Sequence, residues 1–421
     1  MKNEARTDDS RFAHIPPYKR VMLAVLGALV LMVLVNVAKS DGTIKSTAEH
    51  AVVHVISKIE SHGPSPRIHV VQRQIMGTAD EERMIDERFK AGSNAALSVR
   101  VGDADLELLD DDTDEIHVEV FLKGNDMERA REYFDRQKFE VLQESNTVIV
   151  RTAERNWNGN GWKSNGGAQI RVVVHAPHAL DADIRTSDGD VTVGDFRGDL
   201  RLTTSDGDIA TGSLEGAGIT LRTSDGDIVS DVLDTDELSV TTSDGDIVID
   251  RAAAGTINIR TSDGDIKLED VDGEVSISTS DGDIHVGKLS GADATLRTSD
   301  GDIVVEQAMT ARTRVTTSDG SIVLQDARGD IEARTSSGDL SVTLLEVDGD
   351  INLRTGDGDI MISAPTDLRA TLSMRGESIR IASGFSFDGV LKKNEAEGQV
   401  NGGGNRFEAQ ASSGEIVLRE N

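Results

Sequence analysis

The sequence predicts an all-β protein, a single-chain β-solenoid in which coils of 18–20 residues stack on one another. Three observations predict this fold: a six-residue motif at a nearly fixed period, alternation of apolar residues around it, and an Asp-Gly turn at one phase of the repeat. The motif is Thr-Ser-Asp-Gly-Asp-Ile, and successive copies begin 18 to 20 residues apart. Intact and drifted copies lie at Thr186–Val191, Thr204–Ile209, Thr223–Ile228, Thr242–Ile247, Thr261–Ile266, Thr279–Ile284, Thr298–Ile303, Thr317–Ile322, Thr335–Leu340 and Thr355–Ile360.

One repeat, Asp246–Gly264, contains two strand-like pieces. Ile247 and Ile249 alternate with Val248 in the first piece, and Ile257 and Ile259 show the same period of two in the second. Such alternation indicates strands that bury one face. We expect a tight turn at Ser-Asp-Gly, where the Asp side chain bonds its own backbone and Gly supplies a positive φ. A second, looser turn is expected between the two strand pieces.

Two topologies fit this pattern. In a solenoid each repeat is one coil, whereas in an antiparallel meander each Asp-Gly closes a two-residue hairpin. The solenoid is favoured because identical turns at one phase stack well, while a meander this long has to close or split. The variable coil length fits a strict hexapeptide left-handed helix poorly, so we expect a right-handed β-helix. The solenoid predicts one internal column made of Ile209, Ile228, Ile247, Ile266, Ile284 and Ile303.

The position three residues before the turn Asp alternates between arginine and a hydroxyl residue. In a solenoid this position forms an outward column, and alternation keeps the guanidinium groups about 9–10 Å apart rather than about 4.8 Å. Duplication of a two-coil unit explains the alternation equally well. The column comprises Arg185, Thr203, Arg222, Thr241, Arg260, Ser278, Arg297 and Thr316.

The N-terminal segment predicts a single membrane anchor. Residues 21–38 carry no charge and are long enough for a transmembrane helix. Lys19 and Arg20 precede this stretch, so residues 1–20 are expected to be a cytoplasmic tail, with everything after residue 38 periplasmic or extracytoplasmic. A cleaved signal peptide is the alternative, but the apolar run is long and Asn36 makes a poor cleavage site.

The rest of the chain divides by composition and pattern. A stalk is expected first, and the charged stretch at its end, Asp80–Arg88, is read as helical. A short helix is expected at Asp126–Gln137, because Met127, Ala130 and Phe134 share one face. The expected segments are a stalk or linker (39–83), an N-terminal β region (84–183) containing that helix and a Gly/Asn loop (156–167), the regular coils (184–364), and degenerate C-terminal coils with a cap (365–421).

Charge and cysteine content exclude several classes of partner and linkage. The formal net charge of −31 argues against nucleic acid and against anionic lipid surfaces as partners. The chain has no cysteine, so disulfides are excluded.

The paired aspartates of the motif are a candidate cation site. In a solenoid they form two columns of carboxylates, illustrated by Asp244 and Asp246 followed by Asp263 and Asp265. Ca²⁺ favours clustered carboxylate and carbonyl oxygens, so it is a possible but minor cofactor. The alternative, which we favour, is that Asp serves turn geometry and solubility. No cofactor is therefore expected.

No catalytic, cofactor-binding or metal-ligating residues are predicted. General acid–base catalysis needs groups in different environments, whereas these carboxylates recur in nearly identical surroundings. His175 and His178 form a His-x-x-His pair without further ligands nearby in sequence, so we expect no zinc site there. The absence of nucleophile, phosphate-loop and zinc motifs predicts that the protein is not an enzyme and has no small-molecule substrate.

Two further features have ordinary explanations. Arg197–Asp199 and Arg328–Asp330 spell Arg-Gly-Asp, but both fall at the second turn, where Gly and Asp are expected anyway. Trp157 and Trp162 lie in the Gly/Asn loop, which is expected to be an insertion with one tryptophan packed on the solenoid rather than a binding tip.

From about residue 84 to the C-terminus, the chain resembles bacterial β-strand-repeat proteins grouped as a putative-adhesin domain of unknown function. The resemblance rests on Arg88-Phe89 before Leu97–Val99, Ala176-Pro177 before Asp183–Asp190, and Gly402–Gly404 before Ser412–Ile416. It implies a β-helical fold outside the cytoplasm and supplies no catalytic motif. This sequence departs from the pattern in its uniform, acidic repeats and its inserted helix.

A single anchor, a stalk and a stiff repetitive rod predict a non-enzymatic envelope protein with a binding, adhesion or scaffold role. Ladders of identical residues suit an extended or repetitive partner, such as an envelope polymer, a protein or another copy of the rod. The alternative is an envelope-stress sensor that signals through a cytoplasmic partner, because the twenty-residue tail has no domain of its own.

Overall fold

The structure is a computed structural model that describes residues 81–421 except 93, 112, 154–166 and 178. The described residues belong to one compact unit, which runs from His69 to Asn421. The predicted transmembrane helix, the cytoplasmic tail and nearly all of the stalk lie outside them, as do both tryptophans. No helix within the described ranges is long and apolar enough to cross a membrane.

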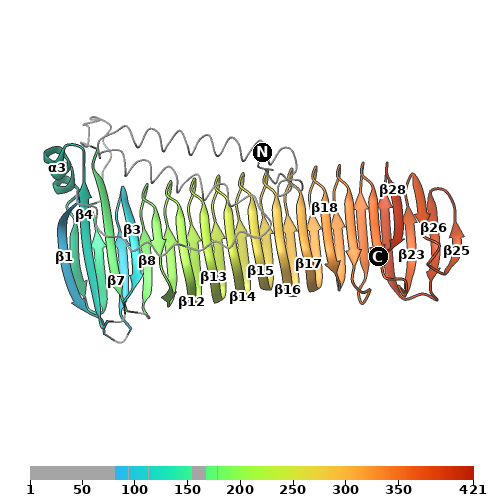
Figure 1. Ribbon diagram of the computed structural model, residues 1–421, viewed down its shortest axis with the longest axis horizontal. Helices are drawn as coiled ribbons and strands as arrows, with labels where there is room; N and C mark the ends of the chain where they lie inside the picture. Colours follow the sequence, from blue (N-terminus) through green and yellow to red (C-terminus); the bar gives the residue numbers. More distant parts are fainter. Residues whose placement is uncertain (1–80, 93, 112, 154–166, 178) are drawn as a thin grey trace, which may run out of the picture. The chain divides into compact units, whose positions relative to one another are not determined.

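The described part of the chain is all-β, as predicted, with one short α-helix. Its strands stack side by side in a long row, which Figure 1 shows from the blue N-terminal strands to the red C-terminal ones. The first strands are β1 (Glu82–Lys90), β2 (Ala96–Arg100), β3 (Ala104–Asp110), β4 (Glu115–Lys123), β5 (Glu140–Glu144), β6 (Thr147–Arg151), β7 (Gln169–Ala176), β8 (Asp181–Arg185), β9 (Val191–Val193), β10 (Phe196–Arg197) and β11 (Leu200–Thr203).

The most regular part consists of six strands of 13 or 14 residues, each spanning most of one coil. They are β12 (Ile209–Arg222), β13 (Ile228–Thr241), β14 (Ile247–Arg260), β15 (Ile266–Ser278), β16 (Ile284–Arg297) and β17 (Ile303–Thr316). Neighbours pair in parallel with an offset of one coil, so the solenoid is confirmed over the antiparallel meander. Its handedness stays a prediction.

Shorter strands complete the row. They are β18 (Ile322–Ala327), β19 (Asp330–Arg334), β20 (Leu340–Leu344), β21 (Ile351–Thr355), β22 (Ile360–Ala364), β23 (Ala370–Arg375), β24 (Ser378–Ile381), β25 (Phe387–Leu391), β26 (Glu395–Val400), β27 (Asn405–Ala411) and β28 (Glu415–Glu420). The last turns are covered by antiparallel pairs, because β26 lies between β23 and β25 and pairs with both.

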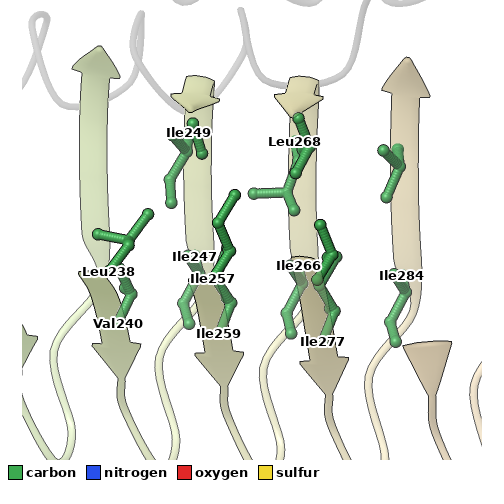
Figure 2. Packing of buried hydrophobic residues seen from close by; sticks show 14 of the residues in the cluster. Leu238, Val240, Ile247, Ile249, Ile257, Ile259, Ile266, Leu268, Ile277 and Ile284 are labelled. Atoms are coloured by element: carbon green, nitrogen blue, oxygen red, sulfur yellow. The ribbon is translucent and has the colours of Figure 1, made fainter. Parts of the chain in front are cut away.

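The core is a set of stacked apolar columns. Ile247 pairs with Ile266, and Ile266 pairs with Ile284, each in parallel register. All six isoleucines of the predicted column are at most 1% exposed, which confirms that they share one internal face. Figure 2 shows this column beside a second one that includes Ile257. Each coil thereby buries two short apolar stripes against the coils on either side.

The role predicted for the turn glycines is wrong. Within the described residues, the glycines with positive φ include Gly198 and Gly273 of the second turn but none from the Ser-Asp-Gly motif. At Gly264 an added Cβ would lie 1.9 Å from the carbonyl oxygen of Gly245, its counterpart one coil earlier. Glycine is required there because successive turns stack backbone on backbone, which leaves no room for a side chain.

The local bonding predicted for the turn is also corrected. Thr261 is 7% exposed, and its Oγ1 lies 3.1 Å from the carbonyl oxygen of Ser243 and 3.0 Å from that of Gly245. The same oxygen accepts from the N–H of Gly264 at 3.3 Å. The buried threonine, rather than the aspartate, therefore closes the turn and ties it to the preceding coil.

The second aspartate of each motif bonds to the next coil. Oδ1 of Asp246 accepts a 2.8 Å hydrogen bond from the backbone N–H of Asp265, and Oδ1 of Asp227 accepts one of 2.9 Å from Asp246. This ladder continues from the N-terminal strands to Glu415 with one weak step at Ser321. Each carboxylate satisfies an amide that the parallel strand pairing does not reach.

The N-terminal end is built differently from the coils. β1 pairs antiparallel with β4, and β4 pairs antiparallel with β7. The helical expectation for Asp80–Arg88 is wrong, because residues from Glu82 belong to β1, whose Met84 and Ile85 pack on the core. The expected short helix is present as α3 (Met127–Gln137), with Asp126 accepting from the N–H of Arg129 at its N-terminus.

Candidate functional site

The outward columns of the coils are the first candidate surface. Arg222 pairs with Thr241, and Thr241 pairs with Arg260, so the predicted alternating column exists in register. Arg222, Arg260 and Arg297 are exposed, and their guanidinium groups make no hydrogen bond or ion pair with any described residue. We call these three residues the arginine column. Its cationic groups are free to meet a partner.

The two aspartate columns differ in what they do. The second aspartate of each motif is engaged in the coil-to-coil ladder. The first aspartate is exposed, as at Asp206, Asp225 and Asp244, and its carboxylate makes no hydrogen bond or ion pair within the described ranges. At Asp188, burial raises the pKa of the carboxyl, and the neighbouring charges of Asp103 and Asp206 raise it further. Like charges therefore face each other along this edge.

A shallow hollow crosses several coils on the face that carries the arginine column. Its volume is about 780 Å³. The residues lining it come from successive strands and are mostly polar, including Ser98, Thr220, Ser239, Thr256 and Asn258. A hollow shared by many coils suits a ligand lying along the row of strands more than a compact metabolite.

The two Arg-Gly-Asp tripeptides are used by the fold. Oδ1 of Asp199 accepts from the N–H groups of Ala217 and Gly218, both at 3.0 Å. In the second copy, Oδ1 of Asp330 accepts from the N–H of Asp350 at 2.9 Å. Both aspartates are committed to holding the next coil, which agrees with the structural explanation of the tripeptides.

A second candidate is a cluster on the outer face of the N-terminal strands, which we call the histidine cluster: His117, Glu119 and His175. His117 and Glu119 lie on β4, where alternate residues such as Val118 are buried. The register of β4 and β7 places His175 directly opposite His117, and their rings stack with centroids 5.7 Å apart. Possible ligand atoms of the three residues all lie within 4.8 Å of one another.

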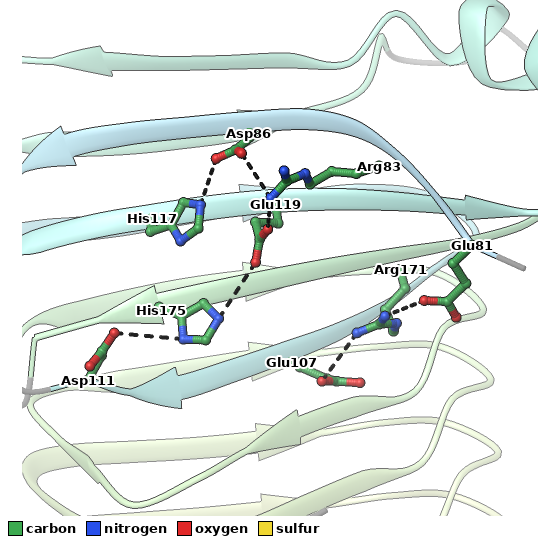
Figure 3. Close-up of polar contacts among 9 residues, drawn as sticks. All are labelled: Glu81, Arg83, Asp86, Glu107, Asp111, His117, Glu119, Arg171 and His175. Atoms are coloured by element: carbon green, nitrogen blue, oxygen red, sulfur yellow. Dashed lines mark hydrogen bonds and ion pairs between the residues drawn. The ribbon is translucent and has the colours of Figure 1, made fainter. Parts of the chain in front are cut away.

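Charged residues surround the histidine cluster (Figure 3). Nε2 of His117 lies 2.8 Å from Oδ1 of Asp86 on β1. Arg83 reaches Asp86 at 2.9 Å and Oε1 of Glu119 at 2.7 Å. The hydrogen bond from His117 holds the pKa of the Asp86 carboxyl below its ordinary value, and Arg83 contributes in the same direction.

Two carboxylates lie near the ring of His175. Its Nε2 lies 3.8 Å from Oε2 of Glu119, and its Nδ1 lies 4.0 Å from Oδ2 of Asp111 just after β3. Beyond this cluster, Arg171 contacts both Glu81 and Glu107 and stacks over the ring of Phe121. One face of these strands thus carries two polar groups, the histidine cluster with its neighbours and the ion pairs of Arg171.

In the sequence His175 stands out only as a pair with His178, which lies outside the described residues. The partners that the structure supplies are 56 and 58 positions earlier in the chain, at Glu119 and His117. A weak signal existed, because His117 and Glu119 are alternate residues on the outward side of a predicted strand. Nothing in the sequence indicated that β7 lies beside that strand.

Comparisons with known proteins found one family model and several solved structures. The family model described as Toastrack DUF4097 matches residues 94–286 and 271–419. A crystal structure of a putative lipid binding protein from Parabacteroides distasonis is 16% identical, covers 66% of this chain and 97% of its own, and gives a TM-score of 0.33. A putative adhesin from Parabacteroides merdae is 12% identical, covers 68% and 97%, and gives 0.30.

No curated protein matches the chain. The family model covers well over half of the sequence and includes the strands from β2 onward, the regular coils and the C-terminal end. The resemblance read from the sequence is therefore confirmed, and the chain belongs to the Toastrack DUF4097 family.

Proposed function

We propose that this protein is a non-enzymatic, membrane-anchored envelope protein whose solenoid binds an extended, repetitive partner outside the cytoplasm. One observation carries the proposal: outward groups that the fold does not use recur at coil spacing. The arginine column and the first aspartates are exposed and unengaged by described residues. The second aspartates and the buried threonines, by contrast, are engaged in holding coils together.

The spacing favours a polymer or a second rod as the partner. Arginines two coils apart are separated by about 9–10 Å. A single exposed charge contact contributes only about 0–1 kcal/mol, so one coil binds weakly. Several contacts made by one partner along the row become effectively intramolecular after the first, which raises the affinity without any new type of contact.

The arginine column is tested by a triple substitution, Arg222→Gln with Arg260→Gln and Arg297→Gln. The control removes the same charge from arginines that carry ion pairs at the second turn, Arg197→Gln, Arg312→Gln and Arg328→Gln. Each full-length variant is immobilised and exposed to envelope extract, and bound polymer and protein are quantified.

We expect the triple variant of the arginine column to retain at least about tenfold less partner than the unsubstituted chain, because the contributions of separate contacts to the binding constant multiply. The control is expected to retain the partner. Equal retention by both variants would exclude the arginine column. Absence of any partner for the unsubstituted chain would count against the binding role itself.

The anchor and the location are part of the proposal. Their support is the uncharged stretch at residues 21–38 with Lys19 and Arg20 before it. Protease added to spheroplasts should digest the solenoid and spare the N-terminal tail. A solenoid that survives while the tail is cut would reverse the orientation.

A further inference from the structure

We propose that the histidine cluster is a binding site for a divalent transition-metal ion of the zinc class. This inference is independent of the proposed binding role of the coils, and it goes beyond the expectation from sequence that the chain has no metal ligands. The ligands are an imidazole nitrogen of His117, Oε2 of Glu119 and Nε2 of His175, all from two paired strands.

The positions suit a common metal ion after small side-chain movements. Zinc bonds to nitrogen and carboxylate oxygen are about 2.0–2.2 Å long, so tetrahedral ligand atoms lie about 3.3 Å apart. The ligand atoms here lie within 4.8 Å of one another, and His175 Nε2 is already 3.8 Å from Glu119 Oε2. Rotation about side-chain bonds closes the difference without moving the strands.

The outer contacts hold the ligands as metal sites usually do. Ligating histidines commonly give their other ring nitrogen to a carboxylate, which sets the tautomer and the ring orientation. Asp86 occupies Nε2 of His117 at 2.8 Å, which leaves Nδ1 for the ion. Asp111 lies beside Nδ1 of His175, and Arg83 binds Oε1 of Glu119 and leaves Oε2.

Burial and charge agree with this assignment. The side chains of His117 and Glu119 are 12% and 15% exposed, while His175 is 30% exposed. The site is thus rigid on the strand side and open to water on the other, which leaves a fourth position for a water molecule. Three carboxylates, of Asp86, Asp111 and Glu119, surround the two rings, whereas the only guanidinium charges that act on this group in the described structure are those of Arg83, which contacts two of the carboxylates, and of Arg88, which lies near Asp86. A divalent cation offsets the excess negative charge.

The ligand set selects the class of ion. Two imidazoles with one carboxylate favour Zn²⁺ and its neighbours, whereas Ca²⁺ prefers six to eight oxygen ligands. The competing explanation is an ion-pair network without metal, in which Arg83 bridges two carboxylates. The two explanations differ in what happens when the imidazoles are removed one at a time. A metal site loses Zn²⁺ binding with either imidazole, whereas an ion-pair network gives Zn²⁺ binding that does not depend on them.

The test is titration of the full-length, tag-free, EDTA-treated chain with Zn²⁺ alone, followed by calorimetry, with Ca²⁺ in parallel. We expect His117→Ala and His175→Ala each to abolish the binding of one equivalent of Zn²⁺ or to lower its affinity at least about 100-fold. Asp86→Asn should lower the affinity for the same equivalent about tenfold. The control is His285→Ala, which removes an exposed imidazole of the coils that pairs with Glu306. It should leave this equivalent unchanged.

A melting temperature equal to that of the unsubstituted chain, measured without metal, checks that each variant folds. If either alanine variant does not fold, Glu119→Gln provides a third ligand variant. Co²⁺ should give a visible absorption band with the unsubstituted chain and lose it in the ligand variants. The proposal is overturned if folded ligand variants bind Zn²⁺ as the unsubstituted chain does. It is also overturned if Ca²⁺ competes equally for the same equivalent.

Discussion

The regular coils and the N-terminal strands bury apolar residues equally well, but they place polar side chains in opposite ways. In the coils the polar residues of the turn meet their own copies: Asp265 bonds to Asp246 as Asp246 bonds to Asp227. In the N-terminal strands antiparallel pairing brings unlike residues together, as with His117 and His175 beside Glu119. Repetition therefore produces ladders, whereas irregular strands can produce a unique cluster.

This difference has a consequence for chemistry. A ladder offers the same environment at every coil, so it suits repeated weak contacts and not a single reactive centre. A cluster of different groups allows one position to differ from all others, which metal binding requires. The predictions below challenge this division of roles, beginning with the largest expected effect.

The internal column is tested by Ile266→Asp. Ile266 is 1% exposed and lies between Ile247 and Ile284, so the substitution buries a carboxylate without a partner. We expect a loss of more than about 4 kcal/mol in the free energy of unfolding, measured by denaturant melts. Lys267→Asp, one residue along and outward, is the control and should cost less than about 1 kcal/mol. Equal costs would show that the coils do not depend on this column.

The backbone stacking of the turns is tested by Gly264→Ala. The new Cβ would meet the Gly245 carbonyl oxygen at 1.9 Å, so the two coils must separate. We expect a destabilisation of about 1–3 kcal/mol in thermal or denaturant melts. Gly218→Ala is the matched control, because nothing lies within 4 Å of its added Cβ. A harmless Gly264→Ala would mean that the turns are looser than the structure indicates.

The threonine ladder is tested by Thr261→Val, which keeps the shape and removes the hydroxyl. Thr261 serves two carbonyl oxygens of the preceding coil and the N–H of Gly264. We expect a loss of about 1–2 kcal/mol, since buried backbone groups lose a partner. Thr241→Val removes a partly exposed hydroxyl of the outward column and should be neutral. A similar cost at both sites would argue against a special contribution from the buried hydrogen bonds of Thr261.

The smallest effects are pH-dependent and have opposite signs in the two regions. Partial desolvation raises the pKa of the Asp105 carboxyl on β3, against the hydrogen bond that it accepts from the N–H of Asp190, so its ionised form costs stability above that pKa. Because this side chain is exposed, Asp105→Asn should stabilise at pH 7 by no more than about 1 °C, and this gain should vanish as the pH falls below about 4.

Glu332 of β19 behaves in the opposite way. The hydrogen bond from Arg314 lowers the pKa of the Glu332 carboxyl, and the charge of Arg334 adds to the effect. This carboxylate stabilises the fold above its ordinary pKa of about 4.3, and the contribution is lost as the pH falls through the lowered value. Glu332→Gln should cost less than about 1 kcal/mol at pH 7 and nothing at about pH 2. Melting curves across this range check both signs.

Much of the fold was predictable because the repeats are local. The period of 18 to 20 residues, the internal isoleucine column and the alternating outward column needed only the assumption that copies stack. The helix at Met127–Gln137 was predictable from its apolar face, and the structure adds Asp126 as its N-terminal cap. The strand β1 was not predictable from the sequence, because its charged residues form a strand only by pairing with β4.

The chemistry inside the motif was less predictable than its outline. The sequence indicated that Asp and Gly are required at the turn, but the reasons assigned to them were local ones. The actual reasons involve the adjacent coil: the Gly245 carbonyl excludes a side chain at Gly264, and Asp246 bonds the amide of Asp265. A residue can therefore be recognised as necessary while its physical role depends on a neighbour one coil away.

By itself the sequence determined that the chain is a stack of similar coils, because each copy carries the apolar stripes and turn residues that one coil needs. Tertiary structure alone decided which different residues meet at the N-terminal end. His117 and His175 are separated by a helix and two strands in the chain, and only the register of β4 against β7 makes them neighbours. Register across distant strands depends on how whole faces pack, and no single stretch of residues encodes it.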